Sequence, residues 1–96
     1  MAIQIKYDGG VYEINGFLNS QNGESLKNHF EALIEHSKGI VLSLNKVLDI
    51  DSCAVNIIAS LQKRASLSDK MFYIIGMGNK KVNEQFTVLN LDGILL

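Results

Sequence analysis

Apolar and polar residues alternate in the first part of the chain, with the period of half-buried β-strands. Residues 3–7 follow this alternation, and residues 11–14 resume it after an Asp-Gly-Gly segment at 8–10. Glycine reaches positive φ without a steric penalty, as short hairpin turns require. We therefore predict that the chain opens with an antiparallel hairpin and that Gly16 ends its second strand.

Three later segments carry the apolar spacing of amphipathic helices. The first follows the N-cap candidates Asn19 and Ser20 and closes at Gly39, the second spans about 51–67, and the third follows Asn79 as its N-cap. The apolar positions are Leu26, Phe30, Leu33 and Ile34 in the first, Val55, Ile58 and Ala59 among others in the second, and Val82, Phe86 and Leu89 in the third.

Two short apolar runs, at 40–44 and 71–75, separate these helices and are typical of strands covered on both faces. Residues 45–51 are predicted to form a loop, and 93–96 either a short last strand or a tail. Strands joined through helices pair in parallel with right-handed crossovers. The prediction is one α/β domain over residues 1–96, with a mixed β-sheet, an N-terminal hairpin and three to four helices.

Composition narrows the class of protein. Hydrophobic residues make up 47% of the 96 residues and charged residues 20%, which fits a packed domain. A net charge of −1 gives no long-range attraction to nucleic acid or to anionic lipid. The start of the chain does not resemble a signal peptide, and no apolar run approaches the roughly 18 residues of a membrane span. With Cys53 as the single cysteine, we expect a cytoplasmic protein.

No catalytic or metal-binding constellation is visible, so we predict neither an enzyme nor a cofactor. His29 and His36 stand about 10 Å apart by helical rise, too far to share a metal without a third ligand. No zinc or phosphate-loop motif occurs. The turn at 76–81, with two glycines and two lysines before a helix, remains a candidate site for a small anionic ligand such as a nucleotide or lipid.

Residues 47–56, Val-Leu-Asp-Ile-Asp-Ser-Cys-Ala-Val-Asn, resemble the signature of the STAS domain, the fold of bacterial anti-sigma-factor antagonists. The resemblance extends to the hairpin, to Gly16-Phe17-Leu18-Asn19 before the first helix, to the order of elements, and to the stretch at 89–94. It implies a regulatory protein that binds a partner anti-sigma factor, which is itself a serine kinase. It also implies that the kinase phosphorylates Ser52 and thereby switches binding off. The implied partner-binding residues are Asn19, Asp51, Ser52, Cys53, Ala54, Val55 and Asn56.

Four positions depart from the family pattern. Ala54 replaces a glycine and Asn56 a second small residue, and their side chains are expected where a partner approaches. Asn19 and Ser43 replace aspartates. These departures fit a divergent antagonist with its own partner, and they also fit a domain that does not switch by phosphorylation.

Alternatives to a regulated antagonist therefore stay open. Asp and Ser are preferred N-cap residues of any helix, so Asp51 and Ser52 are also explained by capping alone, with Cys53 as a small buried residue. The domain would then be a non-phosphorylated scaffold or assembly subunit. A small-ligand sensor that uses the turn at 76–81 is the third hypothesis. The sequence does not identify the partner, the regulated process or the oligomeric state.

Overall fold

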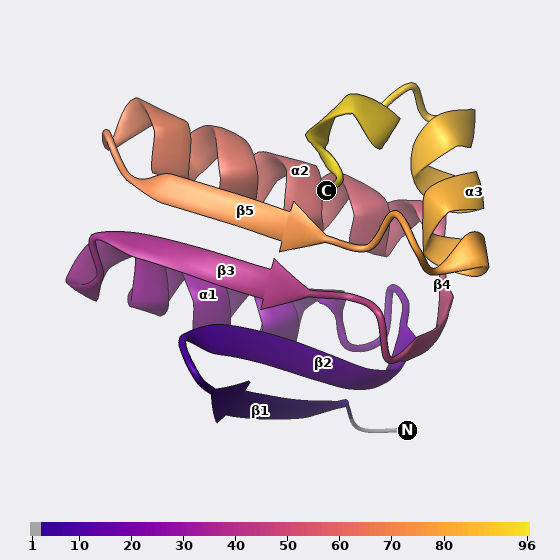
Figure 1. The fold of residues 1–96 in the computed structure, drawn as a ribbon, viewed down its shortest axis with the longest axis horizontal. Helices are drawn as coiled ribbons and strands as arrows, with labels where there is room; N and C mark the ends of the chain where they lie inside the picture. The colour runs from indigo at the N-terminus through magenta and orange to yellow at the C-terminus, as the bar shows by residue number, and fades with distance from the viewer. Residues whose placement is uncertain (1–2) are drawn as a thin grey trace.

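A computed structural model describes residues 3–96 of the chain (Figure 1). A mixed five-stranded sheet carries helices on one face, and its other face is open. The elements in chain order are β1 (Gln4–Asp8), β2 (Val11–Leu18), α1 (Gly23–His36), β3 (Gly39–Ser43), β4 (Val47–Ile50), α2 (Ser52–Leu67), β5 (Met71–Ile75), α3 (Lys80–Val88) and a 3₁₀ turn (Asp92–Ile94). The α/β class and the opening hairpin are confirmed.

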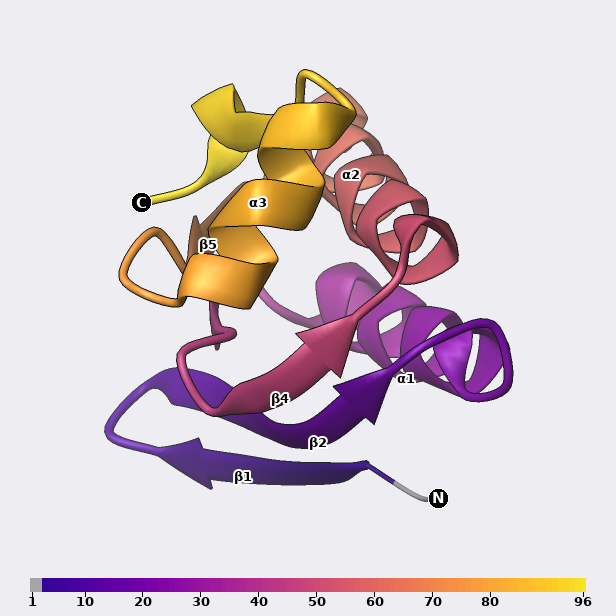
Figure 2. The same ribbon diagram turned by 90° about the vertical axis from the view of Figure 1, so that its right-hand side faces the viewer.

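The strands follow the order β1-β2-β3-β5, and β4 pairs with β2 beside this path. Strand β1 is antiparallel to β2, whereas the pairs β2–β3, β3–β5 and β2–β4 are parallel. The early part of β2 pairs with β3, and its last residues pair with β4 instead. This divided pairing carries the end of β2 away from β3, toward the place where α2 begins (Figure 2).

The prediction that β2 ends at Gly16 is wrong. Gly16 has a φ of 113°, and the register with β4 shifts between Gly16 and Phe17. Because glycine tolerates this conformation and other residues do not, the strand bends at Gly16 and continues to Leu18. The glycine is a bend within the strand and not a terminator.

Residues 45–51 were expected to form a loop, but Val47–Ile50 form β4. Only the first and last residues of this four-residue strand are buried, so it shows no alternation that a sequence pattern can detect. Its pairing with β2 was therefore invisible in the sequence, although this pairing fixes the position of the segment before α2.

The boundaries predicted for α1 are also wrong. The helix begins at Gly23 after Asn22, and it ends at His36 before an extended Ser37, while Gly39 starts β3. A Cβ on Gly23 would lie 2.5 Å from the Ile57 side chain of α2, so a glycine allows the start of α1 to approach α2 closely. The predicted caps of the other two helices, Asp51 and Asn79, are confirmed.

One hydrophobic core lies between the sheet and the helices. Both α1 and α2 lie behind the sheet in Figure 1, and α3 stands at one end. The core includes Ile14, Leu42 and Ile74 from the sheet, Leu26, Phe30 and Ile34 from α1, Val55, Ile58 and Leu61 from α2, and Val82 and Phe86 from α3. The C-terminal segment adds a single parallel bridge, between Leu95 and Ile74, and not a full strand. None of the helices within residues 3–96 is long and apolar enough to cross a membrane.

Candidate functional site

The ends of β2 and β4 meet the first turn of α2 at one end of the sheet (Figure 2). A small surface hollow of about 100 Å³ lies there. Its lining comes from two segments far apart in the sequence, Phe17, Leu18 and Asn19 from the first and Asp49, Ile50 and Asp51 from the second. The β2–β4 pairing brings these segments together, and Ser52 follows directly on the second.

Asp51 connects the start of α2 to the loop between β2 and α1. One carboxylate oxygen accepts the backbone N–H of Ala54 at 2.9 Å, which caps the helix. The other accepts the backbone N–H of Ser20 at 3.1 Å, and the Asp51 N–H donates to the carbonyl of Leu18 at 3.0 Å. A single residue therefore holds the helix N-terminus and the loop in a fixed relation.

The loop between β2 and α1 is further ordered by its own side chains. The Asn19 carboxamide oxygen accepts the backbone N–H groups of Gln21 and Asn22, at 2.9 and 3.3 Å. The Asn22 amide donates to the carbonyl of Phe17 at 2.6 Å, and its oxygen accepts the Asn19 N–H at 3.0 Å. Asn19 therefore stabilises this loop. The sequence pattern predicted that it would cap α1, but the residue at that position is Asn22. The surface beside Ser52 is preorganised.

Ser52 is the first residue of α2 and is exposed. The amide N–H groups of the first helical turn have no acceptor four residues earlier in the helix, and the helix dipole concentrates positive potential there. Asp51 satisfies the amide of Ala54 and leaves the earlier amides of the turn to other acceptors. A phosphate on Ser52 would therefore lie where an anion is tolerated without unfolding the helix.

The structure divides the residues that the sequence pattern assigned to partner binding. Ser52, Cys53 and Asn56 are exposed, and Asn19 and Asp51 are half-buried. Ala54 and Val55 are completely buried, because helical periodicity turns these two positions toward the core. Their side chains do not reach the surface.

Two sequence-based expectations are corrected by these positions. The Ala54 methyl group does not face an approaching protein, so the replacement of glycine by alanine leaves the surface unchanged. Cys53 is exposed and not buried. Ser43, which departs from the family pattern, is buried on β3 between Glu13 and Ile75 in the strand register and does not line the hollow.

Sequence analysis missed an exposed aromatic residue at this site. Phe17 lines the hollow, is 36% exposed and stands opposite Asp49 in the β2–β4 register. An exposed aromatic residue beside a hollow is the kind of side chain that anchors protein–protein contacts. The only signal in the sequence was an apolar pair, Phe17-Leu18, that follows Gly16.

The structure gives less support to a metal site and to a ligand site in the turn at 76–81. No group of three or more His, Cys, Asp or Glu side chains within residues 3–96 is arranged to hold a metal. In the turn at 76–81, the Asn79 amide donates to the carbonyls of Leu44 and Val47, at 3.0 and 2.8 Å, and its oxygen accepts the Val82 N–H. This side chain is therefore occupied by structural bonds.

Comparisons with known proteins agree with this architecture. The family model described as the STAS domain matches residues 1–95. A search of curated protein sequences gave no match.

Solved structures give further matches. A putative anti-sigma-factor antagonist from Thermotoga maritima is 28% identical, with a TM-score of 0.76 over 97% of this chain and 82% of that one. The anti-sigma-factor antagonist SpoIIAA in its unphosphorylated form is 14% identical, with a TM-score of 0.77 over 99% and 86%. SpoIIAA of Bacillus in its phosphorylated form is 13% identical, with a TM-score of 0.70 over 99% and 89%. At such low identity, the likeness to SpoIIAA concerns the fold alone. The family model covers nearly the whole sequence, and this chain therefore belongs to the STAS domain family.

Proposed function

We propose that this protein is an anti-sigma-factor antagonist of the bacterial cytoplasm. Its unmodified form binds an anti-sigma factor that is an ATP-binding serine kinase, and phosphorylation of Ser52 by that kinase ends the binding. The proposed action is stoichiometric binding and not catalysis. The observation that carries the proposal is the exposed Ser52 at the N-terminus of α2, directly after Asp51, which lines an ordered hollow together with the exposed Phe17.

The chemistry of this surface suits reversible protein binding. Phe17 supplies exposed apolar area, and the backbone amides of the first turn of α2 supply hydrogen-bond donors. Because Asp51 and Asn19 already order the surrounding backbone, a partner would meet a rigid surface and would lose little conformational entropy in docking.

The same surface suits control by phosphorylation. A phosphate adds about −1.5 to −2 charges at neutral pH. Asp49 and Asp51 already place two carboxylates on the lining of the hollow, and Ser52 follows directly after Asp51 in the chain. A partner that packs against this patch would have to accept a concentrated negative charge in the interface, which costs binding energy. The helix N-terminus accommodates the phosphate, so the change acts on the interface and not on the fold.

The similarity to a protein solved in both phosphorylated and unphosphorylated forms supports this proposal. The two forms of SpoIIAA match this chain with TM-scores of 0.77 and 0.70. The same STAS architecture thus exists with and without a phosphate in that protein.

Affinity capture from the native cells tests whether this surface binds the partner. We expect the unmodified protein to capture a serine kinase and Asn56→Arg to lose it, because Asn56 is exposed on the first two turns of α2 and an arginine there would obstruct docking. Asn28→Arg is the matched control, because Asn28 is exposed on α1. Equal capture by Asn56→Arg and the unmodified protein would contradict the proposed interface.

A non-switching scaffold with the same fold is the second candidate. Asn19 and Asp51 favour it, because both side chains have structural roles that require no modification of Ser52. Under this hypothesis Ser52→Ala and Ser52→Asp would bind any partner equally well. Binding measurements with a changed charge at residue 52 therefore distinguish the two candidate functions, whereas the fold is the same for both.

A further inference from the structure

Strand β1 leaves one of its two edges unpaired within the described residues. It pairs only with β2, over five residue pairs from Gln4↔Asn15 to Asp8↔Val11 (Figure 1). An unpaired edge offers a row of backbone N–H and C=O groups to another strand. None of the residues of the candidate site lies on β1, so this edge is separate from the surface around Ser52.

The hairpin turn determines which backbone groups face this edge. A two-residue loop, Gly9 and Gly10, joins β1 to β2, and both glycines have positive φ. Such a hairpin closes on a hydrogen-bonded pair, here Asp8 and Val11, and the following pairs alternate between bonded and non-bonded. Ile5 and Tyr7 therefore belong to non-bonded pairs, and their N–H and C=O groups point to the free edge. Lys6 turns its backbone groups toward β2.

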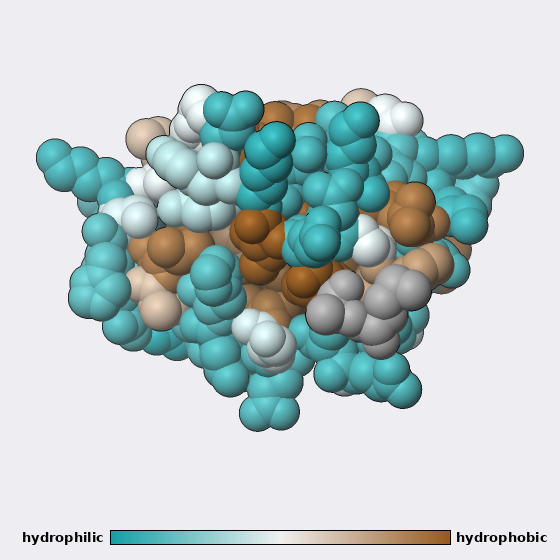
Figure 3. All heavy atoms as spheres, turned by 90° about the horizontal axis from the view of Figure 1, so that it is seen from below, coloured by the Kyte–Doolittle hydropathy of each residue, from teal (hydrophilic) through white to brown (hydrophobic). Residues whose placement is uncertain are grey.

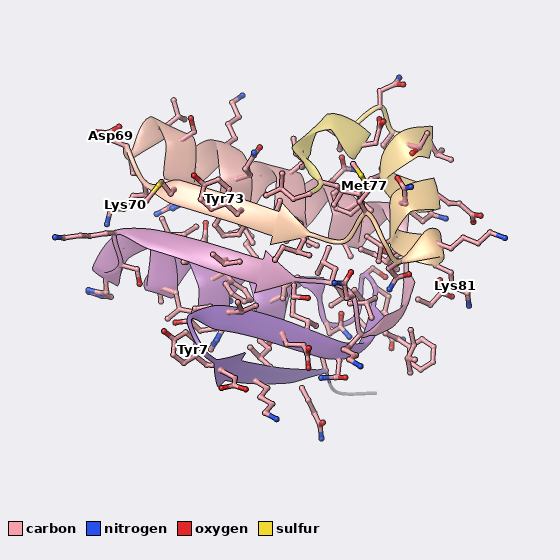
Figure 4. All side chains as sticks on the ribbon, in the orientation of Figure 1. Tyr7, Asp69, Lys70, Tyr73, Met77 and Lys81 are labelled. Atoms are coloured by element: carbon pink, nitrogen blue, oxygen red, sulfur yellow. The ribbon has the colours of Figure 1, made fainter. Side chains whose placement is uncertain are left out.

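The face of β1 that is turned toward the helices carries apolar side chains. Ile5 and Tyr7 stand beside Ile14 and Tyr12 in the register, on the face that packs against the helices. Tyr7 is 61% exposed and its ring lies 4.5 Å from that of Tyr12, at the hairpin end of β1 (Figure 4). Seen toward this edge, apolar atoms form a band between hydrophilic ones (Figure 3).

The charge pattern distinguishes among the ways in which β1 can pair with a second β1. Antiparallel pairing about a two-fold axis places side chains of the same face opposite each other. An axis at Lys6 sets two lysines against each other, which is destabilising. An axis at Tyr7 pairs Lys6 with Asp8 but overlaps only residues 6–8, because the glycine turn follows. An axis at Ile5 overlaps residues 3–7 and opposes Lys6 to Gln4, without a pair of like charges.

We propose that β1 pairs with β1 of a second copy of this chain, antiparallel and with the two-fold axis at Ile5. The outward groups of residue 5 then bond across the axis, and those of residues 3 and 7 bond to each other. Half-buried Ile3 and Ile5 and exposed Tyr7 form one apolar row on the helix side. The two sheets become one continuous sheet, and each copy keeps its own Ser52 surface.

A cysteine at the axis tests this register. Cα atoms of a hydrogen-bonded antiparallel pair lie about 5.5 Å apart, within the range that a disulfide spans. We expect Ile5→Cys, in a Cys53→Ser background, to form a covalent dimer on mild oxidation. Lys6→Cys in the same background is the matched control, because its side chain lies on the opposite face and its counterpart is displaced along the strand. Circular dichroism checks that both variants fold.

Sedimentation velocity of the unmodified chain, over a wide range of concentrations, should show a species of twice the monomer mass. A chain that stays monomeric at all of these concentrations would overturn the proposal. The free edge of β1 would then be available to pair with an extended segment of another protein. Preferential cross-linking of Lys6→Cys would overturn the register. None of these results bears on the binding of the kinase at Ser52.

Discussion

Replacing Ser52 by aspartate should weaken binding of the captured kinase by about 100-fold, or roughly 2.7 kcal/mol. The aspartate adds a fixed negative charge directly after Asp51, next to a hollow that Asp49 and Asp51 already line with carboxylates. A like charge brought into a protein interface costs several kcal/mol when the partner cannot neutralise it. Isothermal titration calorimetry with the purified partner measures the change directly.

The same substitution should leave the fold intact. Residue 52 is exposed and lies in the first turn of α2, where an acidic side chain interacts favourably with the helix dipole. We expect the melting temperature to stay close to that of the unmodified protein. Ser60→Asp is the matched control, because Ser60 is exposed on the same helix but two turns further along. Normal binding by Ser52→Asp, with Ser60→Asp equally unaffected, would favour the non-switching scaffold.

Asp51→Ala should be the site substitution with the largest effect on stability. It removes the N-cap bond to Ala54, typically worth about 1 kcal/mol, and the bond to the Ser20 N–H, worth about 0.5–1.5 kcal/mol. We expect a loss of about 2 kcal/mol in the free energy of unfolding, or roughly 10 °C in melting temperature for a domain of this size. Urea denaturation followed by circular dichroism measures the loss.

Asp49→Ala is the control for this effect. The Asp49 carboxylate accepts only the N–H of the next residue, Ile50, and the side chain is exposed. Its removal should change stability by less than about 0.5 kcal/mol, as for most surface positions. If the two variants were equally stable, Asp51 would not hold the β2–α1 loop to α2 in solution, and the rigid surface assumed for partner binding would lose its support.

Long elements with clear periodicity were predictable from the sequence, because burial of one face imposes the pattern. The apolar spacing in α1 and α3, the runs of β3 and β5, and the capping roles of Asp51 and Asn79 all follow from local chemistry. The glycine turn of the hairpin belongs to the same class, because positive φ at Gly9 and Gly10 is a local requirement.

Features that depend on tertiary contacts were not predictable. Strand β4 exists because residues 47–50 lie beside the end of β2, and Gly16 allows that end to bend. The true start of α1 depends on the packing of Gly23 against Ile57 and on the use of Asn19 within its own loop. A pattern of residue types contains none of these contacts.

The candidate site also combines local features, which were predictable, with tertiary features, which were not. Ser52 and Asp51 were found because the signature resembles that of a known family, and helix capping explains their positions. The family signature alone did not separate inward from outward positions, so Ala54 and Val55 were assigned to the surface although both are buried. Phe17 was missed because its place in the hollow results from the β2–β4 pairing. The surface that a partner meets is therefore a tertiary feature, whereas its modification site is a local one.

Phosphopeptide mass spectrometry on the protein isolated from its own cells tests the central claim most directly. The account predicts a phosphate on Ser52 in part of the molecules, and its loss when the captured kinase is deleted. Absence of phosphate from Ser52 under both growth and stress conditions, or its placement on another serine, would contradict the proposed switch.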